Sequence, residues 1–441
     1  MSLIQDSSRA EPDNAFSNLT VRCMDCGHTF AATRPLTACP DCGGLLDAVI
    51  NTSWPIDRDT FGTALPPNLA QSGVWRYRAL LPAIPDQYIV TRAEGRTPIY
   101  WDDRIAQYAG VASMGLKHEG HNPTASFKDR GMTVGMSHAK AVGARFVACA
   151  STGNTSASLA SYAASANIPA LVLIPEGKIS GGKLAQTLAH GALVVQIEGD
   201  FDAALALLRQ VAADYDRYQV YLVNSVNPFR PEGQKTTVFE LLEQLNWEVP
   251  DVIALPGGNL GNTAAFGKAL TELYETRLIG RMPRIATIQA AGAAPFAAYY
   301  ESGWDHFAPV QAETIATAIK IGNPASTARA MRAIISTGGV VTSVTDDEIM
   351  DAKAEIDRVG IGCEPASAAS LAGVRKLVAS GEIKPGETVV GILTGHVLKD
   401  TDAVTAYHLG PDSEYRPMAN RPVSIPATLD ALEKVLSRHA L

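Results

Sequence analysis

From about residue 95, short apolar runs alternate with stretches of helical periodicity. Continuous apolar strands that alternate with helices are typical of a parallel sheet covered on both faces. The series is too long for one sheet, so we expect two α/β domains that divide near residue 234. The predicted strands are 145–150, 170–175, 194–199, 221–226, 252–256, 286–290 and 388–395, and the predicted helices are 155–166, 181–190 and 232–246.

The remaining segments lack this alternation and define the rest of the domain plan. In open α/β sheets, ligands bind beyond the carboxyl ends of the strands, so candidate sites are expected there. We expect a cysteine-rich segment at 20–48, a Pro- and Trp-containing extension at 49–90, α/β domains at 91–233 and 234–408, and a tail at 409–441.

Composition narrows the class of protein. Of the 441 residues, 46% are hydrophobic and 19% are charged, which is typical of a globular protein. A net charge of −8 argues against a nucleic-acid binder. No apolar run approaches the roughly 18 residues that a membrane span needs, and the first 20 residues lack the features of a secretory signal. We therefore expect a cytoplasmic protein that binds neither nucleic acid nor membrane.

Four of the six cysteines are clustered near the amino terminus. Cys23 and Cys26 form one Cys-x-x-Cys pair, and Cys39 and Cys42 form another after a 12-residue spacer. This spacing resembles a zinc ribbon, in which four thiolates hold one structural Zn²⁺. The alternative is a set of four reduced cysteines without a metal.

Lys128 is the first candidate for covalent chemistry. It lies in the segment HNPTASFKDRGM (121–132), where an extended stretch ends and a helix to about residue 142 is expected. The positive end of the helix macrodipole disfavours an ammonium group, and a Schiff-base lysine requires a lowered pKa. Without other motifs, a solvated surface lysine is the commoner explanation.

Two loops between a predicted strand and a predicted helix are candidate anion sites. STGNTSAS (151–158) and PGGNLGN (256–262) both place backbone N–H groups at a helix start, where an anion is favoured. Each also has a local explanation, an N-capping loop for the first and a tight turn for the second. The second loop does not fit G-x-G-x-x-G because Asn259 occupies the third position, so a dinucleotide site is disfavoured.

Several ordered motifs give the chain a family resemblance. SFKDRG (126–131), EGRTPIY (94–100) and KHEGHNPT (117–124) resemble the threonine synthase branch of the fold-type-II pyridoxal-phosphate (PLP) enzymes, over roughly residues 70–408. The resemblance implies two doubly wound α/β domains of the tryptophan synthase β-like kind and a homodimer. It also implies PLP as cofactor, bound to Lys128 as a Schiff base, and conversion of O-phosphohomoserine to threonine with Lys128 as the base at Cα.

The same resemblance assigns the other site residues. Asn154 is expected at the phenolic oxygen of PLP, Thr394 at the pyridine nitrogen, and Glu364 beside the ring. The expected cup for the PLP phosphate is Gly257, Gly258, Asn259, Leu260, Gly261 and Asn262. The substrate carboxylate is assigned to Ser151, Thr152, Asn154 and Thr155, and the substrate phosphate to Lys183, Asn224 and Arg230. In LTGHVLKD (393–400), Val397 replaces a glycine that is usual in the family.

Three alternatives stay open at this point. The enzyme could be a paralogue that uses another phosphorylated amino acid, such as a cysteate synthase acting on phosphoserine. A threonine dehydratase is disfavoured because it has no use for a second cation cluster. A non-catalytic binding protein that kept the fold is disfavoured by the presence of Lys128, Asn154, the GGNLGN loop and Thr394 together.

Overall fold

The computed structural model describes residues 16, 18–51, 56–63, 65–177 and 181–439, without the side chains of 181–183 and 438–439. The chain divides into two units, Met1–Asp400 and Thr401–Leu441. The second unit contains α14 (Thr401–Leu409), a 3₁₀ turn at Pro411–Tyr415 and α15 (Leu429–His439). Within the described residues, no helix is long and apolar enough to cross a membrane.

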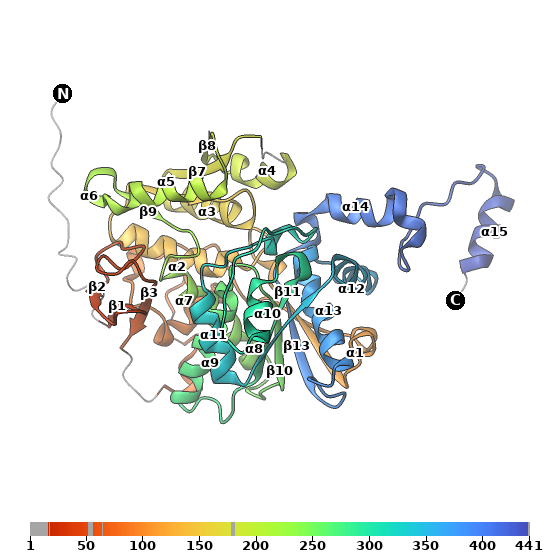
Figure 1. The fold of residues 1–441 in the computed structure, drawn as a ribbon, viewed down its shortest axis with the longest axis horizontal. Coiled ribbons are helices and arrows are strands. Elements are labelled where there is room, and N and C mark those ends of the chain that lie inside the picture. Colours follow the sequence, from red (N-terminus) through yellow and green to blue (C-terminus); the bar gives the residue numbers. More distant parts are fainter. Residues whose placement is uncertain (1–15, 17, 52–55, 64, 178–180, 440–441) are drawn as a thin grey trace. The chain divides into compact units, whose positions relative to one another are not determined.

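Two largely parallel sheets organise the first unit (Figure 1). The six-stranded sheet has the order β12-β11-β10-β13-β5-β4, in which only the edge strand β4 is antiparallel. Its strands are β4 (Ile99–Trp101), β5 (Ser113–His118), β10 (Val252–Pro256), β11 (Arg284–Ala290), β12 (Val340–Val344) and β13 (Thr388–Leu393). The four-stranded sheet has the order β8-β7-β6-β9, from β6 (Phe146–Ala150), β7 (Ala170–Pro175), β8 (Leu193–Ile197) and β9 (Val220–Leu222).

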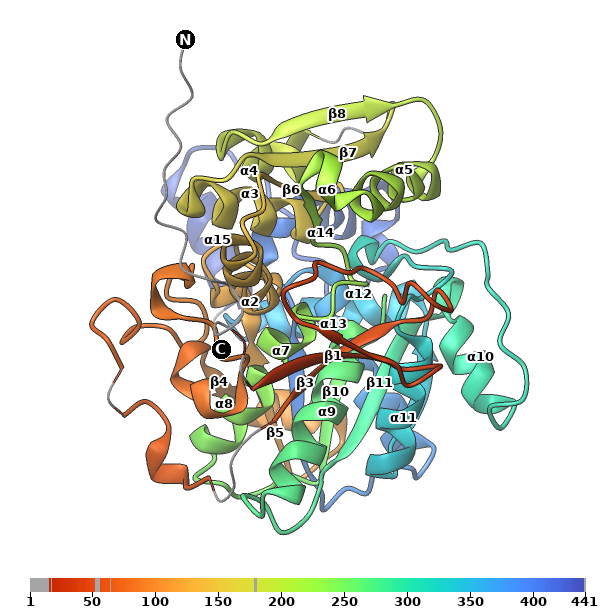
Figure 2. The same cartoon turned by 90° about the vertical axis from the view of Figure 1, so that its left-hand side faces the viewer.

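Helices follow most of the strands and cover the two sheets (Figure 2). In the first unit they are α1 (Asp103–Ala109), α2 (Lys128–Ala141), α3 (Asn154–Ala166), α4 (Gly181–Ala189), α5 (Phe201–Ala213), α6 (Tyr215–Tyr218), α7 (Arg230–Gln234), α8 (Thr236–Gln244), α9 (Gly261–Glu275), α10 (Pro295–Glu301), α11 (Thr327–Thr337), α12 (Asp346–Arg358) and α13 (Pro365–Ala379). The sequence-based prediction of an α/β fold with two sheets is confirmed.

The cysteine-rich segment forms a small antiparallel sheet with the order β2-β1-β3. Its strands are β1 (Leu19–Cys23), β2 (Thr29–Ala31) and β3 (Leu46–Ile50). The extension after it contains 3₁₀ turns at Arg58–Thr60, Trp75–Leu80 and Asp86–Tyr88. Trp75 and Tyr77 from this stretch are fully buried in the body of the first unit.

The structure differs from the prediction at three places. The strand predicted at 221–226 ends at Leu222, and the helix predicted at 232–246 is two helices, α7 and α8, that meet at Lys235. The expected domain limits stay a prediction, but the sheets do not follow chain order. Strands β4 and β5 precede residue 234 and yet join the sheet of β10–β13, because β13 pairs in parallel with β5.

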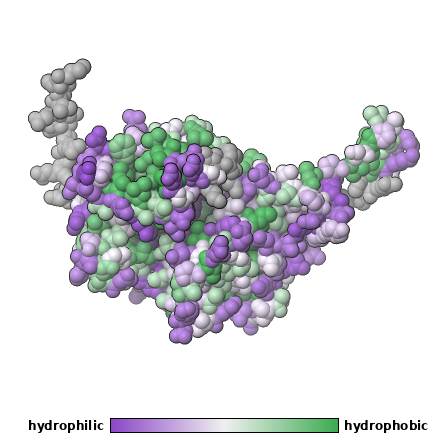
Figure 3. Space-filling view, turned by 45° about the horizontal axis from the view of Figure 1, so that its top comes forward, coloured by the Kyte–Doolittle hydropathy of each residue, from purple (hydrophilic) through white to green (hydrophobic). Residues whose placement is uncertain are grey.

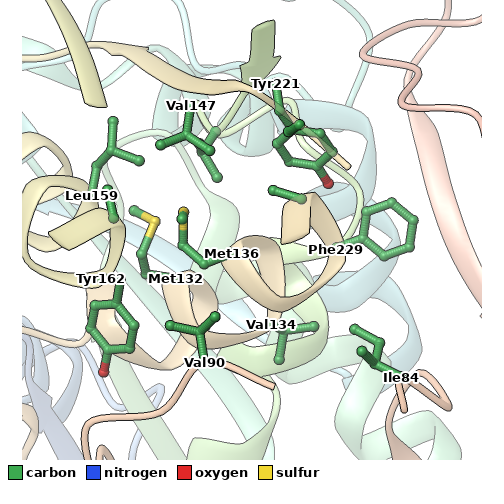
Figure 4. Packing of buried hydrophobic residues seen from close by; sticks show 14 of the residues in the cluster. Ile84, Val90, Met132, Val134, Met136, Val147, Leu159, Tyr162, Tyr221 and Phe229 are labelled. Atoms are coloured by element: carbon green, nitrogen blue, oxygen red, sulfur yellow. The ribbon is translucent and has the colours of Figure 1, made fainter. Parts of the chain in front are cut away.

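Helix α2 lies at the centre of the first hydrophobic core. Its residues 129–139 are all buried, as expected for a helix surrounded by other elements. Figure 4 shows Met132, Val134 and Met136 packed among side chains from β6, α3, β9 and the extension, including Val147, Leu159, Tyr162, Tyr221 and Ile84. The core therefore fixes the helix that begins at Lys128.

The four-stranded sheet has an open edge at β8, where most residues are partly or fully exposed. Figure 3 shows apolar side chains gathered over this part of the molecule. The exposed apolar residues of α4, β8 and α5 are Leu188, Leu193, Val195, Phe201 and Leu207.

Candidate active site

Lys128 is the first residue of α2, and its side chain is partly buried. Its pKa is lowered to about 7, by burial first and by the nearby Arg230 guanidinium second, while Glu364 opposes the shift. The lowered pKa agrees with the prediction, but its causes are burial and Arg230, whereas the sequence argument invoked the helix macrodipole. A lysine with this pKa is a substantially neutral amine near pH 7.

The end of β13 lies directly against the turn before Lys128. The Phe127 N–H donates to the Thr394 carbonyl at 2.9 Å, and the His396 N–H donates to the Ala125 carbonyl at 3.0 Å. Thr394 and Lys128 are therefore held close together by main-chain hydrogen bonds, although 266 positions separate them in the sequence.

Glu364, at the start of α13, joins the asparagine loop to the end of β13. Its carboxylate accepts a hydrogen bond from Asn154 Nδ2 at 3.0 Å and another from Thr394 Oγ1 at 3.1 Å. The Thr394 hydroxyl also lies 3.0 Å from the Ser367 hydroxyl. The structure thus brings Lys128, Asn154, Thr394 and Glu364 together.

The loop 151–155 connects β6 to α3 and stands beside these residues. Its residues Ser151, Thr152, Asn154 and Thr155 are partly exposed, as a loop that meets a ligand requires. Asn224, two residues after β9, holds the end of β6 from which the loop starts, since its Nδ2 donates to the Ala150 carbonyl and its Oδ1 accepts from the Ala150 N–H, both at 3.0 Å. Asn224 thus has a supporting role here, and its expected contact with a substrate phosphate stays a prediction.

Arg230 is a buried cation and the first residue of α7, a helix that contacts α2. It is 2% exposed, and burial lowers its pKa to about 10. Its Nη1 donates to the Val223 carbonyl at 3.2 Å, while Nε has no partner and no carboxylate pairs with it among the described residues. A buried guanidinium without a counter-ion favours the binding of an anion.

Helix α7 can lie this close to α2 because glycines face it. A Cβ on Gly131 would come within 2.9 Å of the Arg230 carbonyl oxygen, and one on Gly233 within 1.7 Å of the Arg130 carbonyl oxygen. The glycines of the two helices therefore set the separation of Arg230 from the first turn of α2.

The glycine loop 257–262 ends at the first turn of α9. Leu260 has the left-handed φ of 62°, and Gly257 donates to the Ile288 carbonyl at 2.6 Å. The Asn259 amide oxygen accepts from the Ala325 N–H at 3.1 Å. Gln234 contacts both helix starts, since it lies 3.6 Å from the Cβ position of Gly261 and 3.2 Å from that of Gly131. The loop therefore lies beside the first turns of α2.

The described residues fit PLP. A Cβ on Gly257 would meet Thr287 at 2.7 Å and one on Gly258 would meet Ile319 at 3.1 Å, so these neighbours restrict both positions to glycine and the loop exposes backbone N–H groups there without side chains. Buried polar atoms that have no hydrogen-bond partner occur in the same motifs, namely Ser126 Oγ before Lys128, Asn262 Oδ1 in the loop, and Ser326 Oγ next to Asn259. A polar ligand would satisfy such atoms, which are otherwise costly to bury.

Three further residues concern the candidate site, one that was predicted and two that were not. Lys183 lies in α4, but its side chain falls outside the described residues. The sequence argument gave no role to Ser326, because nothing in the order of motifs connects residue 326 to the glycine loop. It also missed Lys399, which donates to the Gln186 side chain of α4 and whose pKa burial lowers.

The four clustered cysteines form a second candidate site. Their sulfur atoms all lie within 4.8 Å of one another, with Cys23 and Cys42 at 3.4 Å and Cys26 and Cys39 at 3.7 Å. A disulfide would need about 2.05 Å, and tetrahedral Zn–S bonds of about 2.3 Å place the sulfurs roughly 3.8 Å apart. The spacing therefore suits one tetrahedral metal ion.

Comparison with known proteins gives the class first. The model of the family described as pyridoxal-phosphate dependent enzyme matches residues 90–395. The chain belongs to this family, and within it to the threonine synthases, as two relatives indicate. A threonine synthase of Methanosarcina acetivorans is 44% identical over 94% of this chain and 98% of the relative, and one of Methanocaldococcus jannaschii is 42% identical with the same coverage.

A solved structure agrees at the level of the fold. The threonine synthase of Escherichia coli aligns with a TM-score of 0.66 at 20% identity, covering 95% of this chain and 100% of that one. At this identity the likeness concerns the fold alone. The expected resemblance to fold-type-II PLP enzymes is confirmed.

Proposed function

We propose that the protein converts O-phospho-L-homoserine and water into L-threonine and phosphate, with PLP as cofactor. The observation that carries the proposal is the buried cation Arg230, which lacks a carboxylate partner among the described residues, beside a lysine of lowered pKa. With the glycine loop assigned to the cofactor phosphate, Arg230 is left for a phosphate on the substrate, which a guanidinium binds bidentately. The threonine synthases that are 42% and 44% identical to the chain support the same activity.

Lys128 would hold PLP covalently, with Asn154 at its phenolic oxygen, Thr394 at its ring nitrogen and the loop 257–262 at its phosphate. When bound, PLP supplies an electron sink for the negative charge that develops at Cα of the amino acid. The site residues then have to move protons, orient the substrate and hold its two anionic groups.

The Lys128 amine takes and returns the proton at Cα, a task that suits a base whose pKa is about 7. Ser151, Thr152, Asn154 and Thr155 orient the α-carboxylate at the start of α3. Arg230, with Lys183 and Asn224, holds the phosphate while the Cγ–O bond breaks and phosphate leaves with the electron pair. One proton leaves Cβ and one is added at Cγ, while water supplies the hydroxyl at Cβ and the proton that the departing phosphate takes up, so one phosphate is released for each water consumed.

We also propose that Cys23, Cys26, Cys39 and Cys42 bind one structural Zn²⁺, since their spacing leaves no open coordination position. A homodimer and a cytoplasmic location, both expected from the sequence, stay predictions.

The direct test compares substrates. The holoenzyme is given O-phosphohomoserine, O-phosphoserine or threonine, and phosphate, threonine and ketoacid are measured. Phosphate and threonine in equal amounts from O-phosphohomoserine are expected. Release from O-phosphoserine alone would support the cysteate synthase alternative, ketoacid from threonine alone would support the dehydratase, and no PLP absorbance would support the binding protein.

Two variants assign the roles. Lys128→Ala should abolish both turnover and the visible absorbance band of the lysine-bound cofactor. Arg230→Ala should lower kcat/KM by about 100-fold, which corresponds to the loss of roughly 2.7 kcal/mol of charged hydrogen bonding. The affinity of the Arg230→Ala protein for PLP should change much less. Arg281→Ala, which changes an exposed arginine, is the control. An equal loss of PLP affinity would argue against a substrate role for Arg230.

A further inference from the structure

Glu364 is a buried carboxylate whose contacts are unusual for the protein interior. It is 4% exposed, and no cation pairs with it at ion-pair distance among the described residues. Its hydrogen-bonded partners are the neutral groups Asn154 Nδ2 and Thr394 Oγ1. Burying a carboxylate without a counter-ion is costly, so a merely structural position would favour an uncharged residue.

The Glu364 side chain does not cap the helix at whose start it lies. Glu364 is the N-cap residue of α13, yet its side chain makes no capping hydrogen bond. The carboxylate is directed instead to two residues from other segments, 210 positions before it and 30 after it. Gly395 leaves the space for it, since a Cβ there would lie 2.5 Å from Glu364 Cδ.

We propose that Glu364 is a positioning residue that orients Asn154 and Thr394 for the cofactor with a single carboxylate. The inference rests on the roles proposed above for these two residues. Because the Glu364 carboxyl oxygens accept from Asn154 Nδ2 and from Thr394 Oγ1, they fix the Asn154 amide with Nδ2 toward them. The second N–H of Nδ2 is then available to the phenolic oxygen, and the amide cannot flip to present its oxygen there.

The same contact sets the Thr394 hydroxyl. The Thr394 hydroxyl donates to Glu364 Oε1, with the two oxygens 3.1 Å apart, and Ser367 Oγ at 3.0 Å is the other near partner. Burial raises the pKa of Glu364, which the hydrogen bonds from Asn154 and Thr394 and the charges of Lys399 and Lys128 oppose. The carboxylate thus contacts residues from both sides of the proposed cofactor site, Asn154 and Thr394.

The test measures the dissociation constant of PLP and the absorbance maximum of bound PLP, which do not depend on the substrate. Glu364→Gln should weaken PLP binding about tenfold and shift the maximum. Gly395→Ala, which displaces the carboxylate without changing it, should act in the same direction. Glu355→Gln is the matched control, because Glu355 is also buried at 3% but pairs with Arg358 on its own helix.

Repeating the substitution in a background without Asn154 and Thr394 separates positioning from a general structural effect. In a background that carries Asn154→Ala and Thr394→Val, Glu364→Gln should change PLP affinity by less than twofold, because the groups that it orients are gone. A tenfold effect that persists in this background would overturn the proposal, as would folded Glu364→Gln and Gly395→Ala proteins that bind PLP like the wild type. If the wild type binds PLP but does not act on O-phosphohomoserine, the proposed function fails while this result stands.

Discussion

At the scale of residues, Lys128 and Lys268 differ in the charges that surround them. Lys268 pairs with Glu232 and Asp47, and these carboxylates raise its pKa above the usual value. Among the charges near Lys128, Arg230 has the largest effect on its pKa. No ion pair among the described residues offsets the effect of burial on this pKa. A reactive amine therefore results from the absence of a close carboxylate partner.

This difference predicts the pH dependence of cofactor capture. Only the neutral amine attacks the aldehyde, so the rate at which the apoprotein captures PLP should rise with pH and be half-maximal near 7. Arg230→Ala should move the midpoint upward, because a neighbouring positive charge that disfavours the ammonium form is removed. Stopped-flow absorbance over pH 5–10 measures the midpoint, and a wild-type value near the ordinary 10.5 of lysine would contradict the assignment.

The sequence predicted a site of separated motifs, and the structure joins several of them. Lys128, Asn154 and Thr394 were expected together, and main-chain pairing of residues 125–127 with 394–396 explains the proximity of two of them. The positioning contacts of Glu364 could not be predicted, because they depend on how the start of α13 meets two distant segments. Ser326 was missed for the same reason, because only a main-chain hydrogen bond in the folded chain places it next to Asn259.

At the scale of elements, the contact between α2 and α7 determines where Arg230 lies. Gly131→Ala would place a Cβ 2.9 Å from the Arg230 carbonyl, a main-chain atom that can move only with α7. Gly135→Ala on the same helix meets only side chains, Val223 at 3.1 Å and Arg230 at the ordinary contact distance of 3.4 Å, and is the milder control. We expect Gly131→Ala to cost about 1–3 kcal/mol of stability and to raise KM for the phosphorylated substrate more than Gly135→Ala does. Equal effects in denaturation and kinetics would contradict this view.

His138, near the end of α2, links the helix to the cysteine-rich sheet. Its Nε2 lies 2.7 Å from the Ala32 carbonyl, so Nε2 carries the proton and Nδ1 accepts from the Tyr221 hydroxyl at 2.8 Å. Burial lowers the pKa of His138 to about 3. The unfolded chain takes up this proton below about pH 6.5, whereas the folded chain does not.

Stability should therefore be lost as the pH falls from about 6.5 toward 3. The contribution of His138 is about 1.4 kcal/mol per pH unit over this window. In His138→Gln, which keeps a hydrogen-bond donor and removes the titration, the free energy of unfolding should depend less steeply on pH between 6 and 4. Urea denaturation at several pH values measures the slopes. His306→Gln, at an exposed histidine, should behave like the wild type, and an unchanged slope in His138→Gln would refute the argument.

Strands with continuous apolar runs were predictable from the sequence. The strands 170–175 and 252–256 were predicted with the bounds that β7 and β10 have. Strand β5 escaped notice because it contains Lys117 and His118, which are fully buried. Lys117 is tolerated there because its Nζ pairs with Glu240 at 2.5 Å, a partner 123 residues away that a local pattern cannot reveal.

At the scale of the whole first unit, the cysteine-rich sheet contacts three helices of the body. Besides the link from His138 of α2, Lys268 of α9 pairs with Asp47 at 3.3 Å, and Arg329 Nε of α11 lies 2.9 Å from Met24 Sδ. Helix α2 begins at Lys128 and α9 begins in the glycine loop. The small sheet therefore braces the two helices whose starts are proposed to hold the cofactor, a connection that no single segment of sequence displays.

If Zn²⁺ organises this sheet, its removal should be felt at the cofactor site. Chelation should lower the free energy of unfolding by at least about 2 kcal/mol and Tm by roughly 5 °C, because metal binding stabilises only the folded segment. PLP affinity should fall at the same time, since α2 and α9 lose a brace. Elemental analysis should find one zinc per chain, and Cys42→Ser should reproduce the loss and be insensitive to chelator. A metal-free protein with unchanged Tm and PLP affinity after chelation would show that the four cysteines are reduced thiols without a metal. In that case no metal in the cysteine-rich sheet would contribute to the stability of α2 and α9.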